Sequence, residues 1–203
     1  MAELSDGESK KTQSARAQSD AGPRTQSGTG DVDAALAGAR RGPPSIEKGA
    51  ADEAYDIRIG RDGTWYYHGS PIRRPALVKL FATVLRRDAA GDYWLITPAE
   101  RGRITVDDAP FVAVAVEVAG QGEDQVLTFR TNLDAVREAG PEHPIRVTFA
   151  ADTGEPSPYI RIAEGLDALL SRPVFYELAE IAVARDGRMG VWSHRTFFPL
   201  DQA

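Results

Sequence analysis

The hydrophobic pattern of the chain changes abruptly near residue 54. Before that point there is no aromatic residue, and the branched aliphatic residues are Leu4, Val32, Leu36 and Ile46. A segment so poor in apolar side chains buries too little surface to offset the entropy lost on ordering. We therefore predict a disordered leader over residues 1–53. The alternative is a docking segment around a short helix at residues 31–41 that folds on a partner.

From residue 55 onward, apolar and polar positions alternate with a period of two. Residues 56–60 form one alternating run, Asp62 and Gly63 supply turn chemistry, and residues 64–68 form a second run. Two such runs around an Asp-Gly dipeptide predict a β-hairpin.

The second run of this hairpin is rich in aromatic residues. Alternation places Trp65 and Tyr67 on one face of the strand and Tyr66 and His68 on the other. We expect Trp65 and Tyr67 to pack in the core, because a small sheet-rich unit needs their large apolar areas. Tyr66 and His68 are then left on the opposite face.

Two stretches change to the helical spacing of three and four residues. Residues 75–87 begin with a proline at the first helical position and end with two arginines. Their apolar positions are Leu77, Leu80, Phe81, Val84 and Leu85. Residues 173–183 also begin with a proline and predict a second helix.

The remaining periodic segments predict short strands. They are residues 93–97, 111–118, 126–130, 145–149, 159–162, 190–194 and 196–198. Many short strands with two helices indicate an α+β fold rich in antiparallel sheet.

The two predicted helices belong to a longer internal match. At an offset of 98 residues, from 74 to 172, six of 21 aligned positions are identical. The identical pairs are Arg74 and Arg172, Pro75 and Pro173, Leu80 and Leu178, Arg87 and Arg185, Asp88 and Asp186, and Trp94 and Trp192. We predict two structurally repeated halves, residues 54–120 and 121–203, each with one main helix.

Several longer runs carry a family resemblance as well. They are residues 63–87, 92–98, 106–114, 129–132, 143–146, 172–180, 190–193 and 197–200. In this order they resemble the bacterial family known as domain of unknown function 1285, over about residues 55–201. The resemblance implies a fold of two repeated halves. It implies no activity, since the family is uncharacterised, although a role in signalling or regulation has been suggested for it.

The composition of the chain argues against several classes of function and location. The formal net charge of −6 argues against a nucleic-acid partner, since binding to phosphates draws on lysine and arginine. No run approaches the ~20 apolar residues of a membrane helix, and the first residues lack the apolar core of a secretory signal. The absence of cysteine fits a reducing compartment, so we expect a cytoplasmic protein.

Catalytic and metal-binding motifs are absent from the sequence. His68, His143 and His194 do not stand at ligand spacing, so we expect neither a metal nor a cofactor. The adjacent Asp107 and Asp108 would point to opposite faces of a strand and do not predict a catalytic pair. A nucleophile and base assembled in space stays open, and enzymatic activity is uncertain but not favoured.

A binding site for a small anion is a more specific interpretation of the sequence. Arg73 and Arg74 directly precede Pro75, where a helix N-terminus offers free N–H groups and partial positive charge. His68 and Tyr66 could line the same anion site. The competing interpretation is that these arginines neutralise acidic neighbours such as Asp107 or Asp108.

The sequence therefore favours a non-catalytic interaction or regulatory module with an unknown protein partner. The alternative is a protein that binds a small anionic ligand at the helix beginning at Pro75, either as a binding protein or as an enzyme. Arginines and histidine gathered around a hollow would favour a ligand. An exposed apolar surface or an open edge strand would favour a protein partner.

Overall fold

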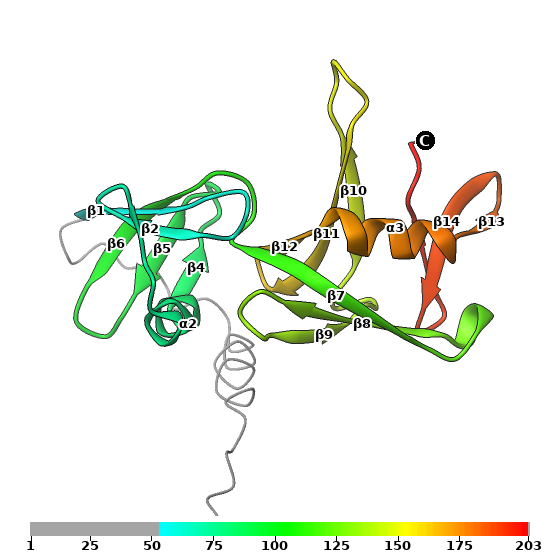
Figure 1. Cartoon of the computed structure of the whole chain (residues 1–203), viewed down its shortest axis with the longest axis horizontal. Helices are drawn as coiled ribbons and strands as arrows, with labels where there is room; N and C mark the ends of the chain where they lie inside the picture. Colours follow the sequence, from blue (N-terminus) through cyan, green and yellow to red (C-terminus); the bar gives the residue numbers. More distant parts are fainter. Residues whose placement is uncertain (1–52, 203) are drawn as a thin grey trace, which may run out of the picture.

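The computed structural model describes residues 53–202. The predicted leader, except for its last residue, and the possible helix at residues 31–41 lie outside them. Two six-stranded sheets lie side by side, and a small third sheet follows the second of them (Figure 1).

The first sheet contains the strands up to residue 106. They are β1 (Glu53–Ile59), β2 (Trp65–Tyr67), β3 (Ser70–Pro71), β4 (Leu85–Arg87), β5 (Tyr93–Ile96) and β6 (Arg101–Val106). Their order is β3-β2-β1-β6-β5-β4, so two antiparallel meanders meet at a parallel pair of β1 and β6. Helix α2 (Pro75–Thr83) connects the two meanders.

The second sheet repeats this arrangement of strands without an intervening helix. It contains β7 (Phe111–Ala119), β8 (Val126–Thr131), β9 (Val136–Glu138), β10 (Ile145–Phe149), β11 (Pro156–Ala163) and β12 (Leu166–Leu170). Their order is β10-β11-β12-β7-β8-β9, with a parallel pair of β12 and β7 at the centre. A 3-10 turn, η1 (Gly122–Asp124), connects β7 to β8.

The last elements cover the second sheet. Helix α3 (Arg172–Glu180) packs on β7, and β13 (Val183–Arg185), β14 (Arg188–Ser193) and β15 (Thr196–Pro199) form the third sheet. The described part of the chain is thus rich in sheet, with two α-helices of nine residues each. Neither helix is long enough to cross a membrane.

Both helices end earlier than their apolar spacing predicts. The helix predicted to reach residue 87 ends at Thr83, and the one predicted to reach residue 183 ends at Glu180. In each case the next residues form a strand, β4 or β13, that pairs with its neighbour. Strand pairing overrides a local helical pattern, since most of a short helix's stability comes from tertiary contacts.

The same element order follows both helices. α2 precedes the meander of β4, β5 and β6, and α3 precedes the meander of β13, β14 and β15. Trp94 and Trp192 both lie on the middle strand, but their surroundings differ. Each ring lies beneath an arginine, Arg101 at 5.5 Å for Trp94 and Arg185 at 4.4 Å for Trp192, but Trp94 Nε1 also donates to Asp88 Oδ2 over 2.8 Å. A repeat at the level of residues stays a prediction.

The strand pairing of β7 shows to which sheet this strand belongs. β7, which we assigned to the first half by dividing the chain at residue 120, pairs with β8 and β12 in the second sheet. The chain crosses between the sheets through residues 107–110, the four positions between the end of β6 and the start of β7.

The core of the first half is built around Trp65. Its side chain is 1% exposed and stacks on Phe81 of α2, with ring centroids 6.1 Å apart. Val78 and Ala82 complete the buried face of that helix. Tyr67, expected to pack beside Trp65, is 52% exposed instead. It lies at the end of a three-residue strand and contacts the ring of His68.

We predict that Trp65→Ala lowers the free energy of unfolding by about 3–5 kcal/mol, the usual cost of removing a buried aromatic side chain. Trp65→Phe should cost clearly less, because Trp65 Nε1 meets no hydrogen-bond acceptor among residues 53–202. Urea denaturation measures both values, with the half-exposed Tyr67→Ala as the control. Equal costs for the two Trp65 variants would contradict this packing.

Candidate binding site between the two halves

Arg73 and Arg74 are exposed at the start of α2. Arg74 is the N-cap residue and makes no side-chain capping hydrogen bond, and Pro75 follows it in the first turn. Among residues 53–202, neither arginine forms an ion pair or a side-chain hydrogen bond. Their guanidinium groups are therefore accessible.

Tyr66 and His68 have other contacts. The Arg58 guanidinium lies 4.8 Å from the ring centroid of Tyr66, and His68 Nδ1 lies 2.7 Å from Asp56 Oδ2. His68 lies in the turn after β2, with a positive φ of 46°. These contacts do not join Tyr66 or His68 to the two arginines before α2.

The carboxylates predicted as partners of those arginines are engaged elsewhere. Asp107 Oδ2 accepts from Arg58 Nη1 over 2.7 Å, and Asp108 Oδ2 lies 3.1 Å from Arg61 Nε. The interpretation that Arg73 and Arg74 neutralise Asp107 or Asp108 is therefore wrong.

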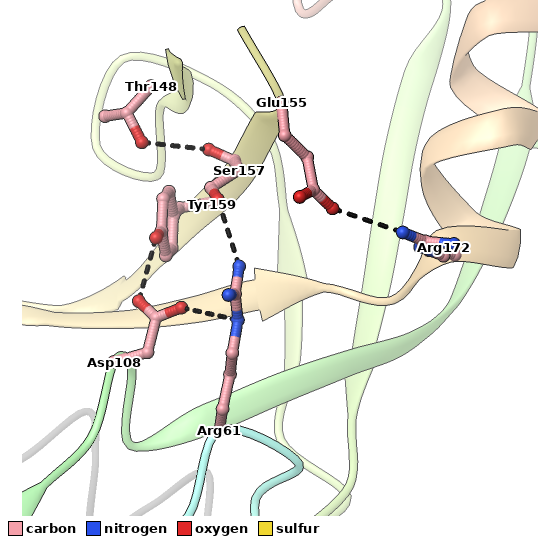
Figure 2. A network of polar contacts seen from close by, with 7 residues as sticks. All are labelled: Arg61, Asp108, Thr148, Glu155, Ser157, Tyr159 and Arg172. Carbon is pink, nitrogen blue, oxygen red and sulfur yellow. Dashed lines mark hydrogen bonds and ion pairs between the residues drawn. The ribbon is translucent and has the colours of Figure 1, made fainter. Parts of the chain in front are cut away.

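Asp108 connects the two halves of the molecule (Figure 2). Its Oδ1 accepts a 2.8 Å hydrogen bond from the buried Tyr159 hydroxyl of β11, while its Oδ2 faces Arg61 from the turn between β1 and β2. Arg61 also donates to Ser157 Oγ over 3.1 Å. Burial, and next the hydrogen bond to Asp108, raise the pKa of the Tyr159 phenol. Tyr159 therefore stays protonated and donates at neutral pH.

The hairpin of β10 and β11 contributes the neighbouring contacts in Figure 2. Thr148 Oγ1 donates to the Ser157 carbonyl over 3.4 Å, and Arg172 at the start of α3 donates to Glu155 over 3.1 Å. The Arg172 pair is exposed on both sides, so it contributes at most about 1 kcal/mol.

Further polar contacts join the halves beside α2. Lys79 Nζ lies 2.6 Å from Asp134 Oδ2, and Asn132 Nδ2 donates to the Gly63 carbonyl over 3.3 Å. Gly63 has a φ of +80°, and a Cβ there would lie 2.5 Å from Asn132 Nδ2. Only glycine fits this approach between the first hairpin and the second sheet.

A second carboxylate, that of Asp167 on the second sheet, lies near Asp108. Asp167 is buried and pairs with Arg146 at 2.8 Å and with Arg161 at 3.5 Å. Arg146 also stacks on Tyr159, 4.1 Å from the ring centroid. Both carboxylates at this junction are therefore matched by arginines.

The junction borders a cleft of about 440 Å³. Its lining includes Tyr55, Arg87, Tyr93, Arg103 and Asp108. It opens where β4 ends and β5 begins, at the end of the first sheet that leads into residues 107–110. All of its lining residues lie within residues 54–108, in the first sheet and the connection. Concave sites with a few convergent polar groups are common ligand sites.

A second, open cleft of about 490 Å³ lies in the second half, lined by Arg137, Glu138, His143 and His194 among others. His194 Nε2 lies 2.7 Å from Glu138 Oε2, and His143 Nδ1 lies 3.0 Å from the Arg161 carbonyl. No group of three or more metal-ligating side chains occurs within residues 53–202.

Ser193, beside His194 in the sequence, is not placed as a nucleophile. Its Oγ is buried, donates to the Ala139 carbonyl over 2.7 Å and accepts from Leu127 N–H over 3.0 Å. The following two-residue turn has positive φ at both His194 (48°) and Arg195 (58°), as in a type I′ turn. Ser193 is a structural anchor for that turn.

Comparison with models of known protein families shows the family of this chain. The model for the N-terminal domain of DUF1285, a domain of unknown function, matches residues 47–109, and the model for its C-terminal domain matches residues 110–200. This chain belongs to the DUF1285 family. The boundary between the two family domains falls within residues 107–110, where the chain passes from one sheet to the other.

Two solved DUF1285 structures are similar to this one. The protein from Silicibacter pomeroyi DSS-3 is 47% identical, with a TM-score of 0.71, and the match covers 83% of this chain and 94% of that one. The protein from Shewanella baltica OS155 is 28% identical, with a TM-score of 0.49, covering 62% of this chain and 91% of that one. No functionally curated protein matches. Membership in this family therefore assigns no activity to the chain.

Sequence reasoning missed the groups that meet at the junction of this DUF1285 protein. Arg61 and Tyr159 are 98 residues apart; the sequence pattern gave Arg61 no role and placed Tyr159 only in a strand. Arg87 was assigned to the basic end of a helix, but it ends strand β4. The one available signal was the adjacent Asp107 and Asp108, for which pairing with arginines was already an alternative.

We predict that Asp108→Ala lowers the free energy of unfolding by about 1–3 kcal/mol, because the buried Tyr159 hydroxyl loses its acceptor. Asp107→Ala is the matched control. It should cost about 0–1 kcal/mol, since its partner Arg58 is half exposed.

A double-mutant cycle of Asp108→Ala with Tyr159→Phe, followed by urea denaturation, should give a coupling of about 1 kcal/mol. Equal costs for the two aspartate variants, with no coupling to Tyr159, would show that Asp108 does not join the halves.

Proposed function

We propose that this DUF1285 protein is a non-catalytic interaction or regulatory module of the cytoplasm. Support comes from the side chains with catalytic potential, which hold the fold together. Ser193 is buried and hydrogen-bonded, and Asp107 and Asp108 are paired with arginines. The signalling role suggested for the family is compatible with such a module.

The observation that carries the proposal is an open strand edge beside exposed apolar side chains. β13 ends the third sheet, so one of its edges has no partner strand among residues 53–202, and all three of its residues are exposed. Val183 on β13 is 45% exposed, Met189 on β14 is 44% exposed, and Tyr176 on α3 is 61% exposed. Val183 lies opposite Gly190 and Met189 opposite Ala184, so these two side chains lie on different faces of the sheet along the same edge. These three elements follow one another along the chain (Figure 1).

Such a surface suits a partner that adds an extended segment. The free N–H and C=O groups of an edge strand bind another backbone, and neighbouring apolar side chains provide selectivity. Exposed tyrosine also provides a large contact area at low entropic cost. A protein partner at this edge is therefore the occupant that we propose.

The variant Tyr176→Lys/Val183→Lys tests this surface. Proteins retained by the immobilised wild type are identified by mass spectrometry and then titrated in purified form. We expect the double variant to bind the partner at least about tenfold more weakly, because it places two charges in a contact that buries apolar area.

Leu80→Lys on α2 is the matched control, since Leu80 is also an exposed apolar residue but lies on the first half. It should bind as the wild type does. A purified partner that binds the double variant as tightly as the wild type would disprove the proposed surface.

The second candidate function is the binding of a small anion at the start of α2. One observation favours it: Arg73 and Arg74 have no carboxylate partner among residues 53–202, whereas the acidic residues expected to pair with them contact Arg58 and Arg61. A local basic pair in an acidic protein is consistent with a ligand. His68 and Tyr66 support it less, because each has a partner of its own.

For this candidate we predict that the double variant Arg73→Gln/Arg74→Gln is about as stable as the wild type, because no ion pair of the described residues is lost. Millimolar phosphate should raise the melting temperature of the wild type but not of the variant. A phosphate response that survives in the double variant would exclude the start of α2 as its site.

A further inference from the structure

We propose that the cleft at the end of the first sheet, beside the junction with the second half, binds a small oxyanion, a carboxylate or a phosphate, through Arg87 with help from Tyr93. This site is separate from the start of α2 and from the edge of β13. It rests on the position of Arg87, on its lack of a carboxylate partner, and on the balance of charges around it.

Register places Arg87 and Tyr93 at the mouth of the cleft. Arg87 lies directly opposite Tyr93 across β4 and β5, and Tyr93 lies opposite Ile104 of β6. Residues opposite one another share a face of the sheet. Two positions further along the same strands, Leu85 and Leu95 are opposite each other and buried. The apolar face of the first sheet thus ends in a guanidinium and a phenol at the junction.

Arg87 has contacts within the first half and lies close to a turn of the second half. Its Nε donates to the Gly91 carbonyl over 3.1 Å, and its guanidinium lies 5.1 Å from the Tyr93 ring centroid. Gly165, in the turn between β11 and β12, has a φ of +69°, and a Cβ there would lie 3.3 Å from Arg87 Cβ. Arg87 is exposed, and one backbone hydrogen bond and the tyrosine ring orient its side chain, which reduces the entropic cost of binding.

The terminal nitrogens of Arg87 are available as hydrogen-bond donors to a ligand. Its Nε is engaged by Gly91, and no carboxylate of residues 53–202 pairs with its terminal nitrogens. The Tyr93 hydroxyl likewise makes no hydrogen bond within those residues. Burial raises the pKa of the Tyr93 phenol, so its hydroxyl is a donor at neutral pH. A guanidinium edge beside a hydroxyl matches the acceptor geometry of an oxyanion.

The surrounding charges leave room for a negative ligand. Asp108 is neutralised by Arg61, and Asp167 is shared by Arg146 and Arg161. Arg103, on the rim of the cleft, faces Asp92 at 3.5 Å. Each carboxylate at the junction thus has its own cation, and Arg87 is left in excess. An oxyanion would complete this balance, whereas a cation would meet no free carboxylate here.

The test is a thermal-shift titration of the full chain with sodium phosphate and, separately, with sodium succinate, each against sodium chloride of equal ionic strength. At ten times the dissociation constant, a single bound anion should raise the melting temperature by about 3–6 °C. A response to phosphate alone assigns a phosphate ligand, and a response to succinate assigns a carboxylate.

Arg87→Gln should weaken the binding of the responding anion at least about tenfold, since charged hydrogen bonds are lost. The variant Arg73→Gln/Arg74→Gln should retain it. The opposite pattern would overturn the cleft site in favour of the start of α2, and no response to either anion would overturn both sites. Neither result bears on the partner surface at β13.

A second measurement keeps the test decisive if Arg87→Gln does not fold. In the ¹⁵N-labelled wild type, the Nε–H signal of Arg87 and the amide signals of Gly91 and Gly165 should shift as phosphate or succinate is added. Tyr93→Phe, which removes only the hydroxyl, should weaken binding about two- to tenfold. Shifts confined to Arg73, Arg74 and the first turn of α2 would refute the cleft.

Discussion

The chain passes from a central strand of one sheet to a central strand of the next through only four residues, 107–110. This short connection constrains the whole molecule. Because β6 and β7 each pair in parallel with a neighbour, neither can move to an edge without breaking its sheet. The two sheets therefore meet where their central strands β6 and β7 are joined. Polar side chains near the connection, Asp108 first among them, then lie between two sheets and require partners from both.

The pattern of apolar residues predicted many of the elements but not all of them. It indicated no strand at β6, β9 or β12, although β6 and β12 are central strands of their sheets. Strand β7 and the starts of α2 and α3 follow directly from β-branched runs and from prolines at the first turn. The helix ends did not follow, because residues 84–87 fit a helix and a strand equally well. Pairing of β4 with β5, a contact that helical spacing does not reveal, decides between them.

The site was less accessible to sequence reasoning than the fold. Arg73 and Arg74 were singled out because they are adjacent and precede a proline, which are local features. Arg61 and Tyr159 gain their partner only where the two sheets meet, since both contact Asp108 of the connection. Arg87 contacts Gly91 and Tyr93 of its own sheet, and it does so because β4 pairs with β5. One local prediction also failed in a physical way. Alternation put Tyr67 beside Trp65, but a three-residue strand is too short to carry both under α2.

The turn at His194 and Arg195 has a consequence for how the second half assembles. Left-handed backbone at a residue other than glycine costs about 1–2 kcal/mol, so this turn is a poor nucleus for its own hairpin. What holds it is distant in the chain: Ser193 binds Leu127, 66 residues earlier, and Arg195 binds Asp124, 71 residues earlier. The hairpin of β14 and β15, local in sequence, therefore behaves kinetically as a long-range element. We therefore expect it to close after β8 is in place and the third sheet to join the fold late.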